Sequence, residues 1–420
     1  MTLKAAIFRG AAGAAVLLAL AGCSTAAGNA RLDSVEASGD GTLRIGLILD
    51  NTGDQAFLND SQRAAAKLAV QEVNAAGGHK GKPVELLPES AGDDTEAQAR
   101  NLVAAKADVV IGPTDSSHAA AAIAVLSHAR VPLISPANSA AGLSSHQSGG
   151  YYFRTAAADI AQASVLVKLA KDGGAKSLAV VHQDSAYGGE VSSAVAAAAK
   201  DAGLETVSTS DFKPGDARQA AAAAQKAAPD AVVLIAREGA QGAIAELNNA
   251  GLSGSRIVLS DGAFAKYGSG LGSKALDGAR AVVPGLFPSA DFQARLVAVE
   301  PRLKDLSFAA ETFDAVNLAV LAAAEADDDA GRTIAANLIA VSGGSVENLD
   351  RGQAGKKCTS FKDCQALVKS GAAVDYDGES GPVAFDANGD ITTANFMVFT
   401  YGPDNNARVT GRETAGRAAG

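Results

Sequence analysis

Residues 108–135 have the sequence DVVIGPTDSSHAAAAIAVLSHARVPLIS, and their pattern indicates a fold class. An aliphatic segment at 108–112 is followed by an alanine-rich segment at 117–129 and by a second aliphatic segment at 132–135. Short apolar runs of this kind are typical of buried strands, and the segment between them is long enough for a crossover helix. The order strand, helix, strand predicts a parallel sheet that is covered by helices on both faces.

The same alternation extends along the chain in both directions. Before this stretch, a strand at 43–49 precedes a helix at 61–76, which we expect to be capped by Asp60 and ended by Gly77-Gly78. After Tyr152-Phe153-Arg154-Thr155 the pattern restarts. Further strands are expected at 84–87, 177–182, 204–208 and 230–236, and further helices at 95–106, 159–171, 188–201, 216–227 and 239–250. The chain is therefore expected to form two successive α/β lobes, each a doubly wound parallel sheet.

The composition excludes some partners. The chain has 420 residues, enough for about two or three domains and a large core, with 46 acidic and 36 basic residues and a net charge of -10. A net negative charge opposes the attraction that binding to a polynucleotide requires, so we expect no nucleic-acid partner.

The N-terminus resembles an export signal. Lys4 and Arg9 precede or flank an apolar run at 11–21, which is shorter than the roughly 20 residues of a membrane-spanning helix. The run ends in Leu20-Ala21-Gly22-Cys23, which resembles a bacterial lipobox with Cys23 as the lipidation site; the alternative is an ordinary signal peptide. We expect a signal peptide at 1–22, a flexible tether at 23–40, and an exported protein held by lipid on the outer face of the cell membrane.

The two remaining cysteines, Cys358 and Cys364, form a pair in an oxidising compartment. A disulfide between them would close a short loop and stabilise it by roughly 2 kcal/mol. A metal or redox role is the alternative, but no histidine lies nearby and the spacing is not CxxC.

Candidate binding residues follow the ends of the strands, where a two-lobed α/β protein holds small ligands. In the first lobe, Ser116 and Ser139 lie in hydroxyl-rich loops, and the first loop leads into a helix whose N-terminus favours a carboxylate. Helix capping is the alternative role for these serines. In the second lobe, Tyr187 could lie over a ligand and Asp261 could pair with an ammonium group, although both also fit ordinary turns. Together these residues could hold both ends of a zwitterion.

The sequence lacks the usual signals of an α/β enzyme. It contains no HExxH, GxSxG or Walker A motif and no GxGxxG after its first strand, and its five histidines are scattered. We therefore expect a protein that is not an enzyme and that needs no metal or cofactor.

Several short motifs together resemble one family. They are VNAAGGHKGK at 73–82, VIGP at 110–113, PLISP at 132–136, YFRT at 152–155, Tyr187-Gly188, GPVAFD at 381–386 and Gly389-Asp390. In order and spacing, from about Leu43 to Tyr401, the chain resembles the type I periplasmic solute-binding proteins of ABC importers, in their branched-chain amino acid (Leu/Ile/Val) branch. The resemblance implies a three-crossover hinge. We place the first lobe at 41–154 and 286–342, and the second at 155–285 and 343–420, which includes the cysteine loop.

The resemblance also implies roles for the candidate residues. Ser116 and Ser139 would bind the ligand carboxylate, Ala137 would offer its carbonyl to the ammonium, Asp261 would pair with the ammonium, and Tyr187 would cover the ligand. Two departures concern the charges. Asp261 is one methylene shorter than the familiar Glu, and Arg237-Glu238 stands where amino acid binders often have Gly or aromatic residues. Arg237 is therefore a further candidate ligand contact, and this charged pair near the cleft would suit a polar or larger solute.

Phe57, in the first strand-helix loop, is a candidate contact for the ligand side chain, with core packing as the alternative. The resemblance thus predicts a monomeric, substrate-binding lipoprotein that captures a small amino acid, most simply a branched-chain one, and delivers it to an ABC permease. The alternatives are a ligand-sensing lipoprotein and a binder of urea, an amide, an aromatic acid or a polar amino acid.

Overall fold

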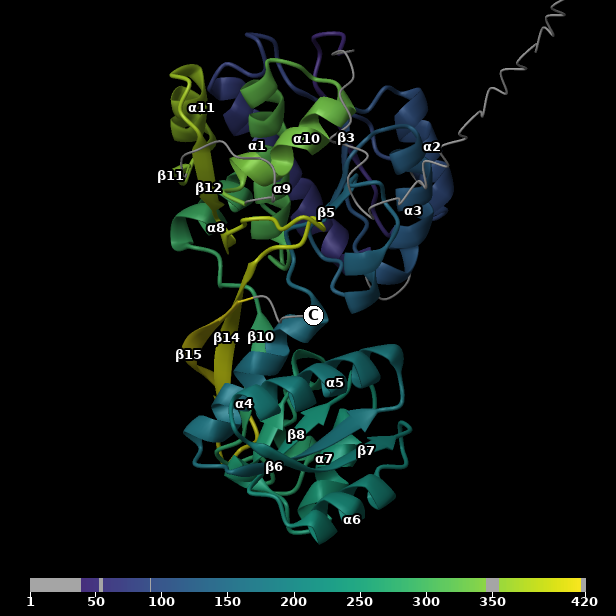
Figure 1. Ribbon diagram of the computed structural model, residues 1–420, viewed down its shortest axis with the longest axis vertical. Coiled ribbons are helices and arrows are strands. Elements are labelled where there is room, and N and C mark those ends of the chain that lie inside the picture. Colours follow the sequence, from purple (N-terminus) through teal and green to yellow (C-terminus); the bar gives the residue numbers. More distant parts are fainter. Residues whose placement is uncertain (1–38, 53–55, 91, 345–354, 417–420) are drawn as a thin grey trace, which may run out of the picture.

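A computed structural model describes residues 39–52, 56–90, 92–344 and 355–416, which form two lobes arranged along the long axis of the molecule (Figure 1). The predicted signal peptide, the predicted lipidation site Cys23 and most of the predicted tether lie outside the described residues. Within the described ranges, no helix combines the length and apolar character needed to cross a membrane.

The first lobe contains a parallel sheet with the strand order β2-β1-β3-β4-β5. Val109 and Ile111 pack into a core with α1 and α9, whereas Val110 packs on the opposite face against α2 and α3. The strands are β1 (Arg44–Leu47), β2 (Glu85–Leu86), β3 (Val109–Ile111), β4 (Leu133–Ser135) and β5 (Tyr152–Arg154), and their helices are α1 (Asn59–Ala75), α2 (Thr95–Ala104) and α3 (Ser116–His128). The predicted alternation of strands and helices is confirmed, and the central strands β3 and β4 are buried on both faces, whereas the short edge strand β2 is not.

One predicted helix cap is wrong. The structure starts α1 at Asn59, so Asp60 lies inside the first turn and does not cap the helix. Its negative charge still favours this position because the N-terminal end of the helix dipole is positive.

The second lobe contains a larger sheet with the order β15-β14-β10-β9-β8-β6-β7. The strands β10, β9, β8, β6 and β7 are parallel, as expected. By contrast, β14 pairs with β10 and β15 pairs with β14, both in antiparallel orientation. The strands are β6 (Ser177–Gln183), β7 (Glu205–Phe212), β8 (Ala231–Ile235), β9 (Ile257–Leu259), β10 (Arg280–Pro284), β14 (Thr393–Tyr401) and β15 (Ala407–Gly416), and the helices are α4 (Gln162–Asp172), α5 (Ala186–Asp201), α6 (Arg218–Ala227) and α7 (Ala240–Asn249).

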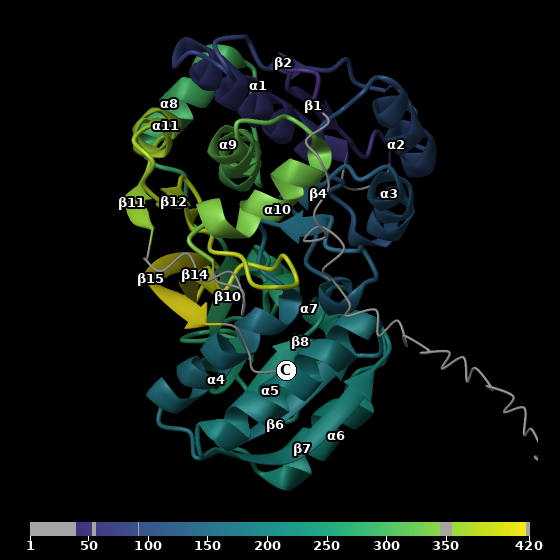
Figure 2. The same cartoon turned by 45° about the horizontal axis from the view of Figure 1, so that its top comes forward.

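The described chain passes between the lobes three times. It crosses after β5, after β10 and before β14, so the expected passages near Arg154 and near Val283-Pro284-Gly285 are both found. After the second passage the chain forms α8 (Ala290–Val299), α9 (Ala309–Ala326) and α10 (Gly331–Val341) in the first lobe. Figure 2 shows α9 surrounded by α1, α8, α10 and α11.

The assignment of all of 343–420 to the second lobe is wrong. The segment forms β11 (Lys356–Cys358), α11 (Phe361–Lys369), β12 (Val374–Gly378) and β13 (Gly381–Pro382), and then crosses to β14. Phe361, Tyr376 and Phe385 are buried in the same core as α1 and α9 of the first lobe. These contacts keep the segment in the first lobe, and the third crossover therefore lies just before Thr393.

The predicted disulfide between Cys358 and Cys364 is present, with its Cα atoms 5.3 Å apart. It ties β11 to α11, and both cysteines are buried in the first lobe's core. The predicted bond is confirmed, although it belongs to the first lobe and not to the second.

A buried ion pair joins the first and third crossovers. Arg154 is fully buried, and its Nε donates to Oδ1 of Asp390 at 2.6 Å. The same guanidinium donates to the carbonyl of Ala140 at 2.8 Å and to the hydroxyl of Ser144 at 2.7 Å. These contacts hold the crossover strands beside the loop that follows β4, which is where the candidate site begins.

Candidate functional site

A cavity of about 260 Å³ lies between the lobes, at the carboxyl ends of β3, β4 and β9 and beside the three crossovers. We call it the inter-lobe cavity. It is lined by residues of both lobes and of the crossovers: Thr114, Asp115, Ser116, Ala137, Ser139, Thr155, Ala156, Ala157, Ala158, Asp159, Gln162, Arg237, Asp261, Pro284, Gly285, Phe308, Glu311, Ser380, Pro382, Ile391, Thr393, Asn395 and Phe396. Its size suits a small solute.

The first-lobe wall is held together by Ser116. Asp115, and not a serine, caps α3 by accepting from the Ser117 amide. The Ser116 hydroxyl oxygen accepts from the backbone N–H groups of Ser139 at 3.1 Å and of Ala140 at 3.3 Å, so it joins the loops after β3 and β4. Because both of these contacts use the oxygen as acceptor, the hydroxyl proton can be donated to a ligand.

The second-lobe wall is organised around Asp261. Its Oδ1 accepts from Nε2 of Gln162 at 2.7 Å and from the Tyr187 hydroxyl, while its backbone N–H donates to Oε1 of Gln162 at 3.0 Å. Burial and the charge of Asp261 raise the pKa of Tyr187, so this hydroxyl stays protonated and donates. Hydrogen bonds from Gln162 on α4 and Tyr187 on α5 therefore fix the orientation of the Asp261 carboxylate.

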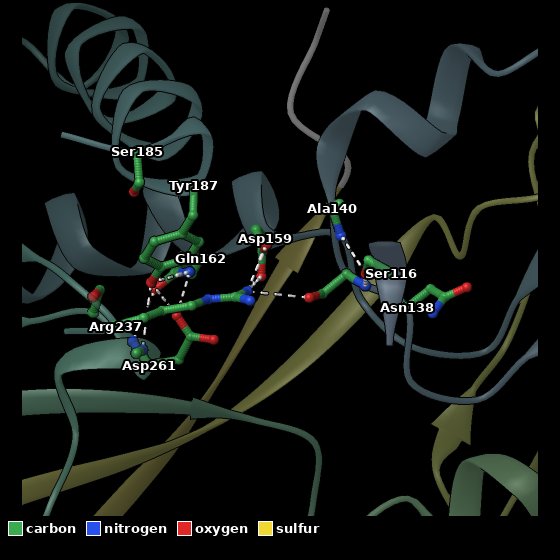
Figure 3. A network of polar contacts seen from close by, with 12 residues as sticks. Ser116, Asn138, Ala140, Asp159, Gln162, Ser185, Tyr187, Arg237 and Asp261 are labelled. Carbon is green, nitrogen blue, oxygen red and sulfur yellow. Dashed lines mark hydrogen bonds and ion pairs between the residues drawn. The ribbon is translucent and has the colours of Figure 1, made fainter. Parts of the chain in front are cut away.

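Arg237 reaches across the cavity from the second lobe (Figure 3). Its guanidinium lies 4.3 Å from the centre of the Tyr187 ring, a cation–π contact. Its Nη2 donates to both carboxylate oxygens of Asp159 at 3.0 and 2.9 Å and, across the gap, to the Ser139 hydroxyl at 3.4 Å. The backbone N–H of Arg237 donates to Oε1 of Gln183, which fixes the start of the side chain.

Asp159 is a cavity residue that sequence reasoning missed. It follows the first crossover, and its side chain is 4% exposed. Burial and the charge of Asp261 raise the pKa of Asp159 to about 6, while Arg237 opposes the shift. Asp159 stands at the start of a predicted helix, where acidic residues are common because they interact favourably with the helix dipole. Its position in the sequence therefore did not indicate a binding site.

The structure brings most of the predicted residues together. Ser116, Ala137, Ser139, Arg237 and Asp261 all line the inter-lobe cavity. Tyr187 lies behind Arg237 and Asp261 and is not part of the lining, so in this structure it supports the wall and does not cover the cavity.

Two other predicted residues are outside the cavity. Phe57 is 62% exposed and does not contribute to the lining, so neither the predicted ligand contact nor core packing describes its position. Glu238 is exposed and also lies outside the lining.

The crossover end of the cavity contains a further carboxylate, that of Glu311 in the first turn of α9. Burial and the nearby Asp314 charge raise its pKa to about 7. Polar Ser380, Thr393 and Asn395 share this end with apolar residues such as Phe396. The sequence pattern did not single out Glu311, since three crossovers from distant parts of the chain create its surroundings.

A sequence profile described as "Periplasmic binding protein" matches residues 42–400. The chain belongs to this family. As its description says, the family consists of periplasmic binding proteins, which act outside the cytoplasm. Proteins of the family are transport components and not enzymes, which confirms the expectation from sequence.

Curated relatives of this periplasmic binding protein are Leu/Ile/Val-binding proteins. A Leu/Ile/Val-binding protein homolog from Brucella melitensis is 31% identical over 181 residues, which are 41% of this chain and 48% of the relative. A leucine-, isoleucine-, valine-, threonine- and alanine-binding protein from Pseudomonas aeruginosa is 30% identical over 42% of this chain and 48% of its own. The chain thus spans about half the length of the curated relatives it matches.

Solved structures confirm the fold. A branched-chain amino acid transporter substrate-binding protein from Streptococcus pneumoniae, in complex with isoleucine, has a TM-score of 0.58 at 24% identity and covers 90% of this chain and 100% of its own. A solute-binding protein from Rhodopseudomonas palustris, in complex with p-hydroxybenzoic acid, has a TM-score of 0.62 at 16% identity and covers 90% and 98%. These neighbours bind ligands of different classes, so the likeness establishes the two-lobed architecture alone.

Proposed function

We propose that this periplasmic binding protein captures a free amino acid between its lobes and delivers it to an ABC permease. The open form binds the amino acid on one lobe, and contacts with the other lobe then stabilise the closed form. A ligand that touches both walls favours closure because it binds the closed state more tightly. A micromolar dissociation constant would correspond to roughly -8 kcal/mol.

The observation that carries this proposal is the pairing of a hydroxyl wall with an oriented carboxylate. Ser116 and Ser139 lie on the first lobe, beside the N-terminus of α3, where a ligand carboxylate is favoured. Asp261 lies on the second lobe with Oδ1 held in place, and among the described residues its Oδ2 has no hydrogen-bond partner. The ammonium of an amino acid would supply that partner.

The charges of the lining favour an amino acid over a simple aromatic acid. Among the described residues of the cavity there are four carboxylates, Asp115, Asp159, Asp261 and Glu311, and one guanidinium, Arg237. A ligand with only a negative charge would enter a mostly acidic cavity, whereas a zwitterion brings a positive group. Branched-chain amino acids are the first candidates because the curated relatives are named for them and because Phe308, Ile391 and Phe396 offer apolar surface.

We further propose that the protein is a monomer, attached to the outer face of the cell membrane by a lipid on Cys23. The support is the lipobox-like sequence that ends in Cys23 and the family's extracytoplasmic location. Mass spectrometry of the protein extracted from membranes tests the anchor: a diacylglyceryl group on a chain that begins at Cys23 is expected.

Isothermal titration of the chain without residues 1–22, unfolded and refolded to remove carried-over ligand, tests the ligand class. Saturable binding of leucine, isoleucine, valine or another amino acid is expected. Binding of benzoate-type acids alone, or no heat with any amino acid, would contradict the proposal and would favour another solute or a sensing role.

A further inference from the structure

Glu311 is a carboxylate inside the inter-lobe cavity, and among the described residues no cationic side chain is paired with it. It lies on the first turn of α9 and lines the crossover end, whereas the guanidinium of Arg237 is paired with Asp159. Within the described ranges, no lysine, arginine or histidine forms an ion pair with Glu311, and the nearest acidic neighbour on its helix is Asp314. A partly buried carboxylate without such a partner favours a cation that comes from outside.

The position of Glu311 is fixed by the crossovers around it. The hydroxyl of Thr155, at the first crossover, donates to the Glu311 carbonyl at 2.9 Å. At the second crossover, Gly285 lies so close that a Cβ atom on it would be 3.3 Å from Oε1 of Glu311. The Thr155 bond fixes the backbone of Glu311, and the carboxylate lies beside Gly285 at the junction of the first two crossovers.

The other residues at this end suit an aliphatic chain with a polar tip. Pro284, Ile391 and Phe396 provide apolar surface, while Thr393 and Asn395 add polar groups close to the same crossovers. A purely hydrocarbon side chain would leave the Glu311 carboxylate desolvated and unpaired, at a cost in binding free energy.

We propose that Glu311 is a specificity-determining residue that binds a cationic group at the end of the ligand's side chain. The ligand class is then an α-amino acid with an alkylammonium side chain, such as lysine or ornithine. Its α-carboxylate would face Ser116 and Ser139, and its side chain would run toward the crossovers. This inference rests on the proposed amino acid function, and it places basic side chains ahead of branched-chain ones as the preferred ligands.

The test compares lysine with norleucine, which has the same carbon chain without the terminal amine. Isothermal titration should show lysine binding at least about tenfold more tightly than norleucine to the unaltered protein. In Glu311→Gln the lysine affinity should fall by about 30-fold, whereas the norleucine affinity should change little. Glu325→Gln, at the far end of α9 and outside the cavity, is the matched control and should bind both ligands like the unaltered protein.

The possible failures can be told apart. If leucine or norleucine binds and lysine binds no better, or if Glu311→Gln leaves the lysine affinity unchanged, the role of Glu311 is wrong while the amino acid function stands. If no amino acid binds at all, the proposed function itself fails. A thermal melt of Glu311→Gln shows whether the variant is folded, and norleucine binding provides a second check on its cavity.

Discussion

Arg237 is the one positively charged side chain among the described residues that line the cavity. Its guanidinium neutralises Asp159, stacks on Tyr187 and reaches the Ser139 hydroxyl of the opposite lobe. As a result, Asp261 and Glu311 are the carboxylates left to interact with a positive ligand group, since Asp115 caps α3.

Asp261→Asn should weaken amino acid binding by about tenfold or more, because the neutral amide cannot pair with the ligand ammonium. The melting temperature should change little, since the amide keeps the size of the carboxylate. Isothermal titration against the preferred amino acid measures the loss, with Glu238→Gln on the neighbouring exposed loop as control. An affinity equal to that of the unaltered protein would remove Asp261 from the binding site.

Glu311 should also make the stability of the ligand-free protein depend on pH. Its pKa is about 7 in the folded protein against an ordinary value of 4.5, so the folded state binds the proton more tightly. The stability linked to this proton is fully present below pH 4.5 and is lost as the pH rises through about 7. Glu311→Gln should therefore be more stable than the unaltered protein at pH 8, by about 2 kcal/mol after allowing for partial exposure.

Urea denaturation at pH 4.5 and at pH 8 measures this difference. Taking the difference between the two proteins cancels the shared contributions of Asp108 and Asp159, whose pKa values burial also raises. A difference in unfolding free energy that is the same at both pH values would show that Glu311 does not titrate in this range.

At the scale of elements, the turn between β12 and β13 is fastened to α9 by a buried carboxylate. Asp314 accepts from the Tyr376 hydroxyl at 2.7 Å, from the Glu379 backbone at 3.0 Å and from the Ser380 backbone at 2.7 Å. These hydrogen bonds keep residues 356–382 in the first lobe. They thereby determine where the third crossover leaves that lobe.

Asp314→Ala should destabilise the protein by about 3 kcal/mol or more, because it leaves several buried donors without an acceptor. Chemical denaturation followed by circular dichroism measures the loss. Thr333→Ala, on the more exposed surface of α10, is a suitable control and should cost much less. A loss of about 0.5 kcal/mol or less, the range of ordinary surface changes, would mean that the turn is held mainly by its apolar contacts.

At the scale of the whole molecule, three crossovers join the lobes, and we expect the lobes to rotate about them as one hinge. The buried pair of Arg154 and Asp390 joins the first and third crossovers, so these strands are expected to move as a unit. The inter-lobe cavity lies directly beside them, and a bound ligand can therefore bias the hinge.

Small-angle X-ray scattering with and without the preferred amino acid tests this closure. The radius of gyration should be smaller in the presence of saturating ligand, because the lobes approach each other. Asp261→Asn at the same ligand concentration is the control and should show a smaller change. An unchanged scattering curve, with binding verified by titration, would indicate capture without hinge closure.

The sequence by itself determined the architecture of the two lobes, because aliphatic strands and amphipathic helices are encoded by residues close together in the chain. The order of hydroxyl-bearing and acidic strand-end loops likewise pointed to Ser116, Ser139 and Asp261, which the fold brings to one cavity. The disulfide was predicted because Cys358 and Cys364 are the two cysteines left once Cys23 is assigned to lipidation.

Only the tertiary structure decided which lobe holds 356–382 and which charges meet in the cavity. The burial of Phe361 and Tyr376 against α9 depends on contacts between residues far apart in the chain. The local sequence pattern does not indicate such contacts. Asp159 and Glu311 likewise have ordinary helix-start sequences. They become cavity residues because the crossovers bring distant segments together. Burial among those segments raises the pKa values of both carboxyl groups.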